Sequence, residues 1–236
     1  IDNYLILGEG FASIGSYNEA IDAYNKGLKS DSLNEKILIE LSKLYINTKQ
    51  DSLAAQTYME IYNKDPSKNS LYLVKAGHIY YEKQNKDKAY SLYNKFIAQG
   101  LKDPIVSINL AEMEFDKKQY EKTISLLKGL EEKYLSDTRV VKMLALSYNQ
   151  TGAQDLSIPT IEKMLSQAPH DQNFIEIAAI AYEKKGNLSS AAKMIKKYLS
   201  FPRTDSHQNY AYRLETLYEK MNNNSLAIKQ YTLNTK

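Results

Sequence analysis

The 236-residue chain contains no cysteine and no tryptophan, and only three of its 31 basic residues are arginine. The lack of cysteine excludes disulfide bonds, thiolate metal ligands and thiol catalysis. It also slightly favours an exported, periplasmic or membrane-tethered bacterial protein over a cytoplasmic one, although the compartment stays open. No apolar run approaches the length of a membrane span, so direct membrane insertion is not expected.

The charge balance argues against a polyanionic partner. The chain has 31 basic and 28 acidic residues, a net charge of +3, and arginine is the residue best suited to bidentate phosphate or base recognition. Repeat proteins that read RNA need polar side chains early in each first helix, where this chain has Leu5, Ile39, Val74 and Ile108. We therefore expect no nucleic-acid partner.

Catalytic and cofactor motifs are also missing from the sequence. Nothing resembles GxxxxGK[ST], HExxH or GxSxG. The glycines of LGEGFASIG, Gly8 and Gly10, are expected inside a helix rather than in a phosphate-binding loop. The three histidines, His78, His170 and His207, lie far apart in sequence. We expect no enzyme activity, no cofactor and no metal site.

The chain is dominated by an internal repeat of about 34 residues. Its seven copies are LGEGFASIGSYNEAIDAYNKGL from Leu7, LSKLYINTKQDSLAAQTYMEIY from Leu41, AGHIYYEKQNKDKAYSLYNKFI from Ala76, LAEMEFDKKQYEKTISLLKGLE from Leu110, LALSYNQTGAQDLSIPTIEKML from Leu144, AAIAYEKKGNLSSAAKMIKKYL from Ala178 and LETLYEKMNNNSLAIKQYTLNT from Leu214. Each copy carries two apolar stripes at helical spacing, so each unit is predicted to be a helical hairpin.

Glycine and proline mark the ends of the predicted helices. Gly15, Gly152 and Gly186 stand where a first helix should end, at the left-handed position that glycine tolerates best. Pro66 and Pro169 follow second helices, where the chain cannot continue helically. One further proline, Pro159, falls early in the second helix of the fifth unit and predicts a kink or a late helix start.

Small and large side chains recur at fixed places in the repeat. The small sites are Gly8, Ser42, Gly77, Ala111, Ala145 and Ala179 in first helices, and Ala20, Ala54, Ala89, Thr123, Ser157, Ala191 and Ala227 in second helices. The large sites hold Phe11, Tyr45, Tyr80, Tyr148, Tyr182 and Tyr218, with Tyr24, Tyr58, Tyr93 and Tyr231 on the second helices. Interlocking of small and large groups predicts close helix pairing.

Repeat length, the Leu-Gly-x-x-aromatic pattern and the Ala-x-x-x-Tyr pattern resemble the tetratricopeptide repeat family over the whole chain. The resemblance implies an all-α, right-handed superhelical solenoid of helix-turn-helix repeats. We expect one domain, 1–236, with units near 1–34, 35–69, 70–103, 104–137, 138–171, 172–207 and 208–236. Because neither end offers a capping helix, a fragment of a longer protein is expected.

In proteins of this family the first helices line a concave face that binds extended peptides or helices. Helical periodicity predicts that this face carries an aromatic and aliphatic patch ringed by charge, which is typical of a protein interface. Its residues are Lys43, His78, Tyr81, Glu82, Glu112, Phe115, Lys142, Leu146 and Asn149. An ion pair between Lys142 and Glu176 is expected in adjacent units. The Lys/Asn pairs of chaperone-binding carboxylate clamps are missing.

The sequence thus predicts a non-catalytic scaffold that binds a peptide or partner protein, within a bacterial multiprotein assembly. Two alternatives stay open. Unprotected ends favour a structural solenoid that self-associates, and the chain could also be the interaction module of a larger enzyme or receptor.

Overall fold

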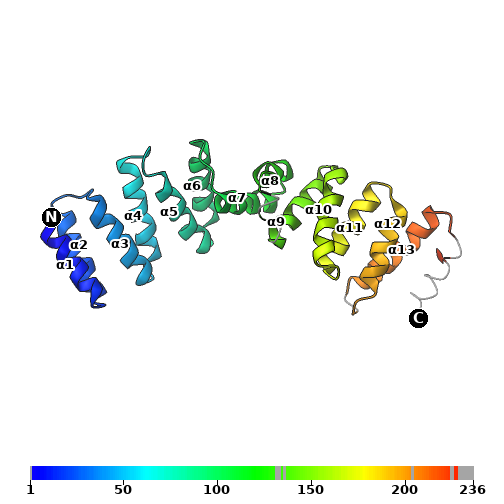
Figure 1. Cartoon of the computed structure of the whole chain (residues 1–236), viewed down its shortest axis with the longest axis horizontal. Helices are drawn as coiled ribbons and strands as arrows, with labels where there is room; N and C mark the ends of the chain where they lie inside the picture. Colours follow the sequence, from blue (N-terminus) through cyan, green and yellow to red (C-terminus); the bar gives the residue numbers. More distant parts are fainter. Residues whose placement is uncertain (1, 131–133, 135–136, 203–204, 224–225, 228–236) are drawn as a thin grey trace. The chain divides into compact units, whose positions relative to one another are not determined.

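The computed structural model describes residues 2–130, 134, 137–202, 205–223 and 226–227, which form thirteen α-helices and no strand (Figure 1). They group into two compact units, Ile1–Met113 and Glu114–Lys236. The helices that begin in the first unit are α1 (Asp2–Ser13), α2 (Tyr17–Leu28), α3 (Glu35–Asn47), α4 (Asp51–Lys64), α5 (Ser70–Glu82), α6 (Lys86–Ala98) and α7 (Pro104–Asp116). Those of the second are α8 (Tyr120–Leu127), α9 (Thr138–Gln150), α10 (Gln154–Gln167), α11 (Gln172–Lys184), α12 (Leu188–Leu199) and α13 (His207–Lys220).

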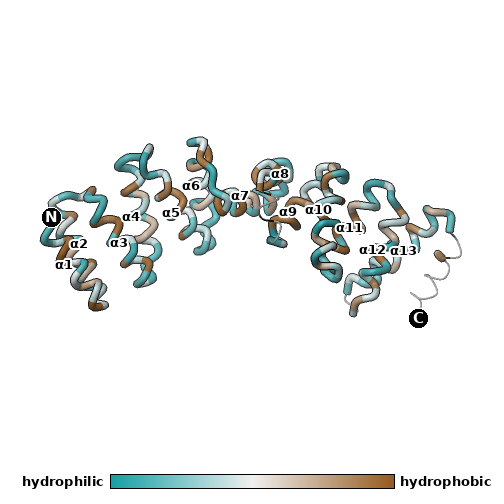
Figure 2. Tube along the Cα trace, in the orientation of Figure 1, coloured by the Kyte–Doolittle hydropathy of each residue, from teal (hydrophilic) through white to brown (hydrophobic). Residues whose placement is uncertain are grey.

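The helix order confirms the predicted all-α repeat. The seven first helices begin within one residue of the predicted unit starts, at Asp2, Glu35, Ser70, Pro104, Thr138, Gln172 and His207. Hydropathy alternates within the helices, as expected where each buries one face (Figure 2). The second helix of the seventh unit falls largely outside the described residues.

The turn inside each hairpin has the same backbone form in all seven repeats. The second residue after each first helix has a positive φ, between 54° and 81°: these residues are Gly15, Lys49, Gln84, Lys118, Gly152, Gly186 and Asn222. The following amide donates to the carbonyl five residues earlier, as in Asn85 to Tyr80 at 2.8 Å. This hydrogen bond satisfies a carbonyl at the helix end. The left-handed turn that was predicted from three glycines therefore occurs in every repeat.

Within the first unit the paired helices approach closely around buried tyrosines. Tyr24 and Tyr93 are almost completely buried beside Gly8 and Gly77. A methyl group at Gly77 would lie 2.5 Å from the Tyr93 ring, so the ring occupies the space that a larger residue would need. The predicted interlocking of small and large groups is present here.

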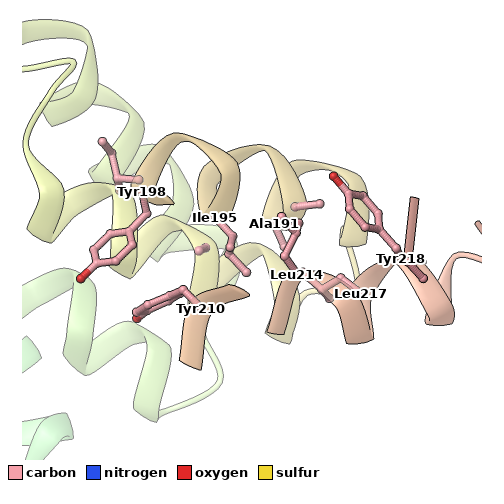
Figure 3. Packing of buried hydrophobic residues seen from close by; sticks show 11 residues of the cluster. Ala191, Ile195, Tyr198, Tyr210, Leu214, Leu217 and Tyr218 are labelled. Atoms are coloured by element: carbon pink, nitrogen blue, oxygen red, sulfur yellow. The ribbon is translucent and has the colours of Figure 1, made fainter. Parts of the chain in front are cut away.

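The core of the second unit includes a cluster between α12 and α13 (Figure 3). Leu214 and Leu217 pack with Ala191, and the rings of Tyr198 and Tyr210 lie 4.4 Å apart. Because these groups come from successive repeats, each hairpin is stabilised by its neighbour as well as by its own pair of helices.

Pro159 does not delay its helix. The predicted late start is wrong, because α10 begins at Gln154 and runs through Pro159 to Gln167. Ile158 and Ile161 on either side of it are buried in the core. Packing of this face holds the helix together although Pro159 lacks an amide hydrogen to donate.

Candidate functional site

The residues predicted for partner binding divide between the two units. Lys43, His78, Tyr81, Glu82 and Glu112 belong to the first unit. The other four, Phe115, Lys142, Leu146 and Asn149, belong to the second. Each group is therefore described within its own unit.

In the first unit, His78 and Tyr81 of α5 lie beside the same buried tyrosine. The Tyr93 hydroxyl lies 2.7 Å from His78 Nδ1, and the Tyr81 ring centroid is 6.5 Å from that of Tyr93. Asn109 Nδ2 donates to the Tyr93 hydroxyl at 3.2 Å, so the hydroxyl hydrogen is available to His78 Nδ1. His78 thus helps to hold the core in place while part of its ring stays accessible.

Burial determines the ionisation of this pair. Desolvation lowers the pKa of His78, against the opposing fields of Asp103 and Glu82. Desolvation also raises the pKa of Tyr93 to about 12. Both side chains are therefore neutral at pH 7.

Charge surrounds this part of the first unit. Lys43 is exposed on α3 and pairs with Glu40 at 2.5 Å, and Glu82 lies at the end of α5. Glu82 is exposed at the end of α5, and Glu112 is half-buried on α7. The predicted charged border is therefore accessible to solvent, with Lys43 and Glu82 more exposed than Glu112.

In the second unit, three of the predicted residues line one pocket of about 300 Å³. Phe115 comes from the end of α7, and Lys142 and Leu146 come from successive turns of α9. The other lining residues are Thr138, Arg139, Met143, Asp171, Asn173 and Phe174. Met143 and Phe174 are buried, so the wall they form is apolar, while Arg139 and Lys142 are exposed at the rim.

Local structure positions the rim of this pocket at the start of two first helices. Asp137 caps α9 by accepting from the amides of Arg139 and Val140. Asp171 caps α11 by accepting from the amides of Asn173 and Phe174 at 2.9 and 3.2 Å. Asp171 keeps its negative charge while it caps the helix, and Arg139 pairs with Asp137 at 3.6 Å, so the two cations at the rim stand beside two capping carboxylates.

Sequence reasoning missed Arg139, Met143 and Phe174 as pocket residues. Arg139 is one of the three arginines of the chain, and that scarcity could have drawn attention to it. Met143 and Phe174 follow the core pattern of their helices, and only the packing of α9 against α11 shows that they also form a pocket wall.

Asn149 does not line the pocket. It is only 2 % exposed, and its Nδ2 donates to the Ile177 carbonyl at 3.4 Å. Its backbone carbonyl accepts from Lys184 Nζ at 2.8 Å. The side chain therefore lies between α9 and α11, in a place where it links two repeats.

Further along the second unit, polar links join α11 to α13. Glu176 accepts from the Tyr210 hydroxyl at 2.6 Å, and Glu183 pairs with Arg213 at 2.6 Å. The Arg213 guanidinium also lies 5.1 Å from the centre of the Tyr210 ring. Burial and the Glu176 carboxylate raise the pKa of Tyr210. Glu176, expected to pair with Lys142, is thus bound to the following repeat.

The described part of the chain offers neither a metal centre nor a membrane span. It contains no group of three or more His, Cys, Asp or Glu arranged to hold a metal ion. None of the helices described is both long and apolar enough to cross a bilayer.

No protein-family model matches the chain. The TPR repeat-containing protein YpiA of Bacillus subtilis (strain 168) is 21 % identical over 166 residues, which cover 69 % of this chain and 38 % of YpiA. The chain therefore spans little more than a third of that relative.

Solved structures show the same fold. YrrB, described as a TPR protein with an unusual peptide-binding site, matches with a TM-score of 0.62 and 18 % identity, over 76 % of this chain and 92 % of YrrB. A tetratricopeptide repeat protein from Parabacteroides merdae ATCC 43184 has a TM-score of 0.53 and 15 % identity over 99 % of this chain and 91 % of its own. MamA from Desulfovibrio magneticus RS-1 has a TM-score of 0.57 and 11 % identity, over 70 % of this chain and 93 % of the MamA chain.

Proposed function

Since the chain has the tetratricopeptide repeat fold, we propose that it is a non-catalytic scaffold that binds a peptide or an extended segment of a partner protein, within a bacterial multiprotein assembly. The observation that carries the proposal is the pocket on α7, α9 and α11, where Phe115, Lys142 and Leu146 come together. YrrB, which has the same fold, is described as having an unusual peptide-binding site, and this supports the same class of function.

The pocket is suited to one kind of ligand segment. The apolar lining residues Phe115, Met143 and Leu146 would bury one aliphatic or aromatic side chain of the ligand. Burial of such a side chain supplies most of the affinity in contacts of this kind. Arg139 and Lys142 at the rim would attract carboxylates flanking that side chain. The expected motif is therefore one large apolar residue with Asp or Glu beside it.

Selection from a random peptide library displayed on phage tests this proposal even though the natural partner is unidentified. Enriched peptides should share an apolar residue with adjacent Asp or Glu. Leu146→Asp should abolish binding of a synthetic enriched peptide, as measured by fluorescence polarisation. Arg139→Glu with Lys142→Glu should weaken it by at least about tenfold, since two favourable charge contacts become repulsive.

Lys163→Glu provides the matched control, because Lys163 is an exposed lysine on α10 outside the pocket. It changes the net charge in the same direction but should leave the affinity within about twofold. Enrichment of basic peptides, or equal binding by the Leu146→Asp variant, would refute this site. A salt-dependent shift with RNA that depends on Arg139 would instead favour nucleic-acid binding.

A further inference from the structure

A hollow of about 470 Å³ lies in the first unit, at the two turns that lead into α5 and α7. Its lining residues are Tyr62 on α4, Pro66 and Ser67 in the turn after α4, and Gln99 and Leu101 in the turn after α6. Tyr62 is only 3 % exposed and forms the base of the hollow, and Gln99 Nε2 donates to its hydroxyl at 3.3 Å. No residue of the hollow belongs to either end of the chain.

The second unit provides an internal comparison, because it contains the same two turns after α10 and α12. The residues equivalent to Tyr62, Pro66, Ser67 and Gln99 are, in the same order, Leu165, Pro169, His170 and Phe201. The rings of His170 and Phe201 lie edge to face with their centres 6.4 Å apart, and Phe201 packs against the buried cluster of α12 and α13. Two rings therefore stand in the second unit at the positions where the first unit has a serine and a glutamine.

The first unit leaves this place open. Ser67 is small, and its hydroxyl donates to Asp65 Oδ1 at 2.6 Å within its own turn. Gln99 is exposed, and Leu101 on the wall of the hollow stays 37 % exposed. An aromatic ring packs favourably in an offset or edge-to-face arrangement on another ring. A ring seated here would contact Tyr62 and Leu101 and bury apolar surface that is now open to water.

One unpaired cation stands beside the hollow. Lys95 Nζ lies 4.6 Å from the centre of the Tyr62 ring. Lys95 is exposed, and no carboxylate among the described residues pairs with it. It is therefore free to bind a carboxylate that a ligand brings next to its ring.

The other charges of the two turns balance one another. Asp65 pairs with Lys68 at 3.4 Å. Asp103 caps the start of α7 and follows the exposed Lys102 in sequence. Lys95 is thus the surplus charge at the hollow, which favours an acidic ligand over a basic one.

The openness of the hollow favours a polypeptide over a small molecule. Pro66, Ser67 and Gln99 are all exposed, so much of a small ligand would stay in water, whereas sites for small molecules bury most of their ligand. A polypeptide gains further contacts on either side of the seated ring.

We propose that this hollow binds an aromatic side chain of a partner polypeptide in which an Asp or Glu stands next to the aromatic residue. The ring takes the place that His170 and Phe201 hold in the second unit, and the carboxylate reaches Lys95. The site is independent of the pocket on α7, α9 and α11, because the two share no lining residue.

The lack of tryptophan in the chain allows a direct binding measurement. The probe is the acetylated and amidated peptide Gly-Asp-Trp-Glu-Gly, whose tryptophan fluorescence anisotropy is followed as protein is added. The titration uses the full chain carrying Leu146→Asp, so that the pocket of the second unit does not contribute. The anisotropy should rise with a dissociation constant on the order of 0.1–1 mM. A flat titration over this range would overturn the proposal.

Two matched ligands test the chemistry of the site. Gly-Lys-Trp-Lys-Gly should bind at least about fivefold more weakly, because its cations would face Lys95. N-acetyltryptophan amide should also bind at least about fivefold more weakly, because it lacks the flanking residues. Equal binding by the basic peptide would refute the role of the carboxylate, and equal binding by the amide would indicate a small-molecule site; either result overturns the proposal.

Ser67→His combined with Gln99→Phe tests the location, because it gives the first unit the two residues that stand at these positions in the second. The same pair packs at the equivalent turns of the second unit, so the variant should keep its helical content by circular dichroism. Its affinity for the acidic peptide should fall at least about tenfold, since its own rings would fill the hollow. Undiminished binding would show that the peptide binds elsewhere and would overturn the proposal.

Lys95→Glu and Lys88→Glu form a matched pair of charge changes on α6. Lys95→Glu should weaken binding of the acidic peptide by about fivefold, whereas Lys88→Glu, at an exposed lysine outside the hollow, should change it by less than about twofold. This pair decides the question if the double variant fails to fold, because each member alters a single exposed charge. Equal affinities of the two variants would contradict the proposed contact.

Discussion

Replacement of Gln84 by glycine should stabilise the protein. Gln84 lies in the turn between α5 and α6 with φ of 60°, in the left-handed region, and its side chain is exposed. Its amide donates to the Tyr81 carbonyl at 3.0 Å and the next amide to Tyr80, so the backbone bonds do not require a side chain. Gly15, Gly152 and Gly186 adopt the same conformation in other repeats.

The expected gain follows from two opposing effects. A residue with a Cβ atom costs about 1–2 kcal/mol in the left-handed conformation. Glycine loses about 0.5–1 kcal/mol more backbone entropy on folding than other residues. The net gain for Gln84→Gly is therefore about 0.5–1 kcal/mol, which corresponds to a rise of about 2 °C in Tm for a chain of this size.

Urea and thermal unfolding followed by circular dichroism would measure the gain, with Gln84→Ala as the matched control. The alanine variant also removes the side chain but keeps the Cβ atom, so its midpoint should stay at or slightly below that of the wild type. Because repeat arrays need not unfold in one step, the first transition is the quantity to compare. A Gln84→Gly midpoint no higher than that of Gln84→Ala would refute the reasoning.

Three further predictions concern single contacts. Gly77→Ala should destabilise the first unit by about 1–3 kcal/mol in urea unfolding, because its methyl group would lie 2.5 Å from the Tyr93 ring; an unchanged midpoint would show that the ring can shift. Stability should rise as the pH rises toward the ordinary histidine pKa of about 6.5, because the lowered pKa of His78 in the folded state means that the unfolded state binds the proton more tightly. His78→Gln should reduce this slope, and an equal slope would place its origin elsewhere. Glu183→Gln removes the carboxylate that pairs with Arg213. It should lower the free energy of unfolding by at most about 1 kcal/mol in thermal unfolding, since both side chains are partly exposed, and a larger loss would contradict this expectation.

The repeat allowed most of the fold to be predicted. Seven copies at nearly constant spacing placed the first helices to within one residue, because each hairpin makes the same contacts and therefore repeats the same pattern of small and large residues. The expectation of a late helix start at Pro159 was wrong. Pro159 lies inside α10 because buried neighbours on the helix outweigh the missing hydrogen bond.

The candidate site was predictable only in part, because helical periodicity shows which side of one helix a residue occupies but not what a neighbouring helix places beside it. Phe115, Lys142 and Leu146 were chosen by their positions in the repeat and line one pocket. Asn149 was chosen by the same rule, yet α11 buries it.

The sequence by itself determined the repeated helical hairpin and the lack of thiol chemistry, since these depend on composition and on local spacing. Tertiary structure alone decided which of those residues share a pocket, that Arg139 joins them, and that the left-handed turn occurs in every repeat whether or not glycine is present. It also left Tyr4 and Leu7 of α1 exposed, at 37 % and 46 %. Exposure depends on whether a neighbouring helix covers a residue, and the internal repeats show that the same pattern is buried wherever such a helix is present.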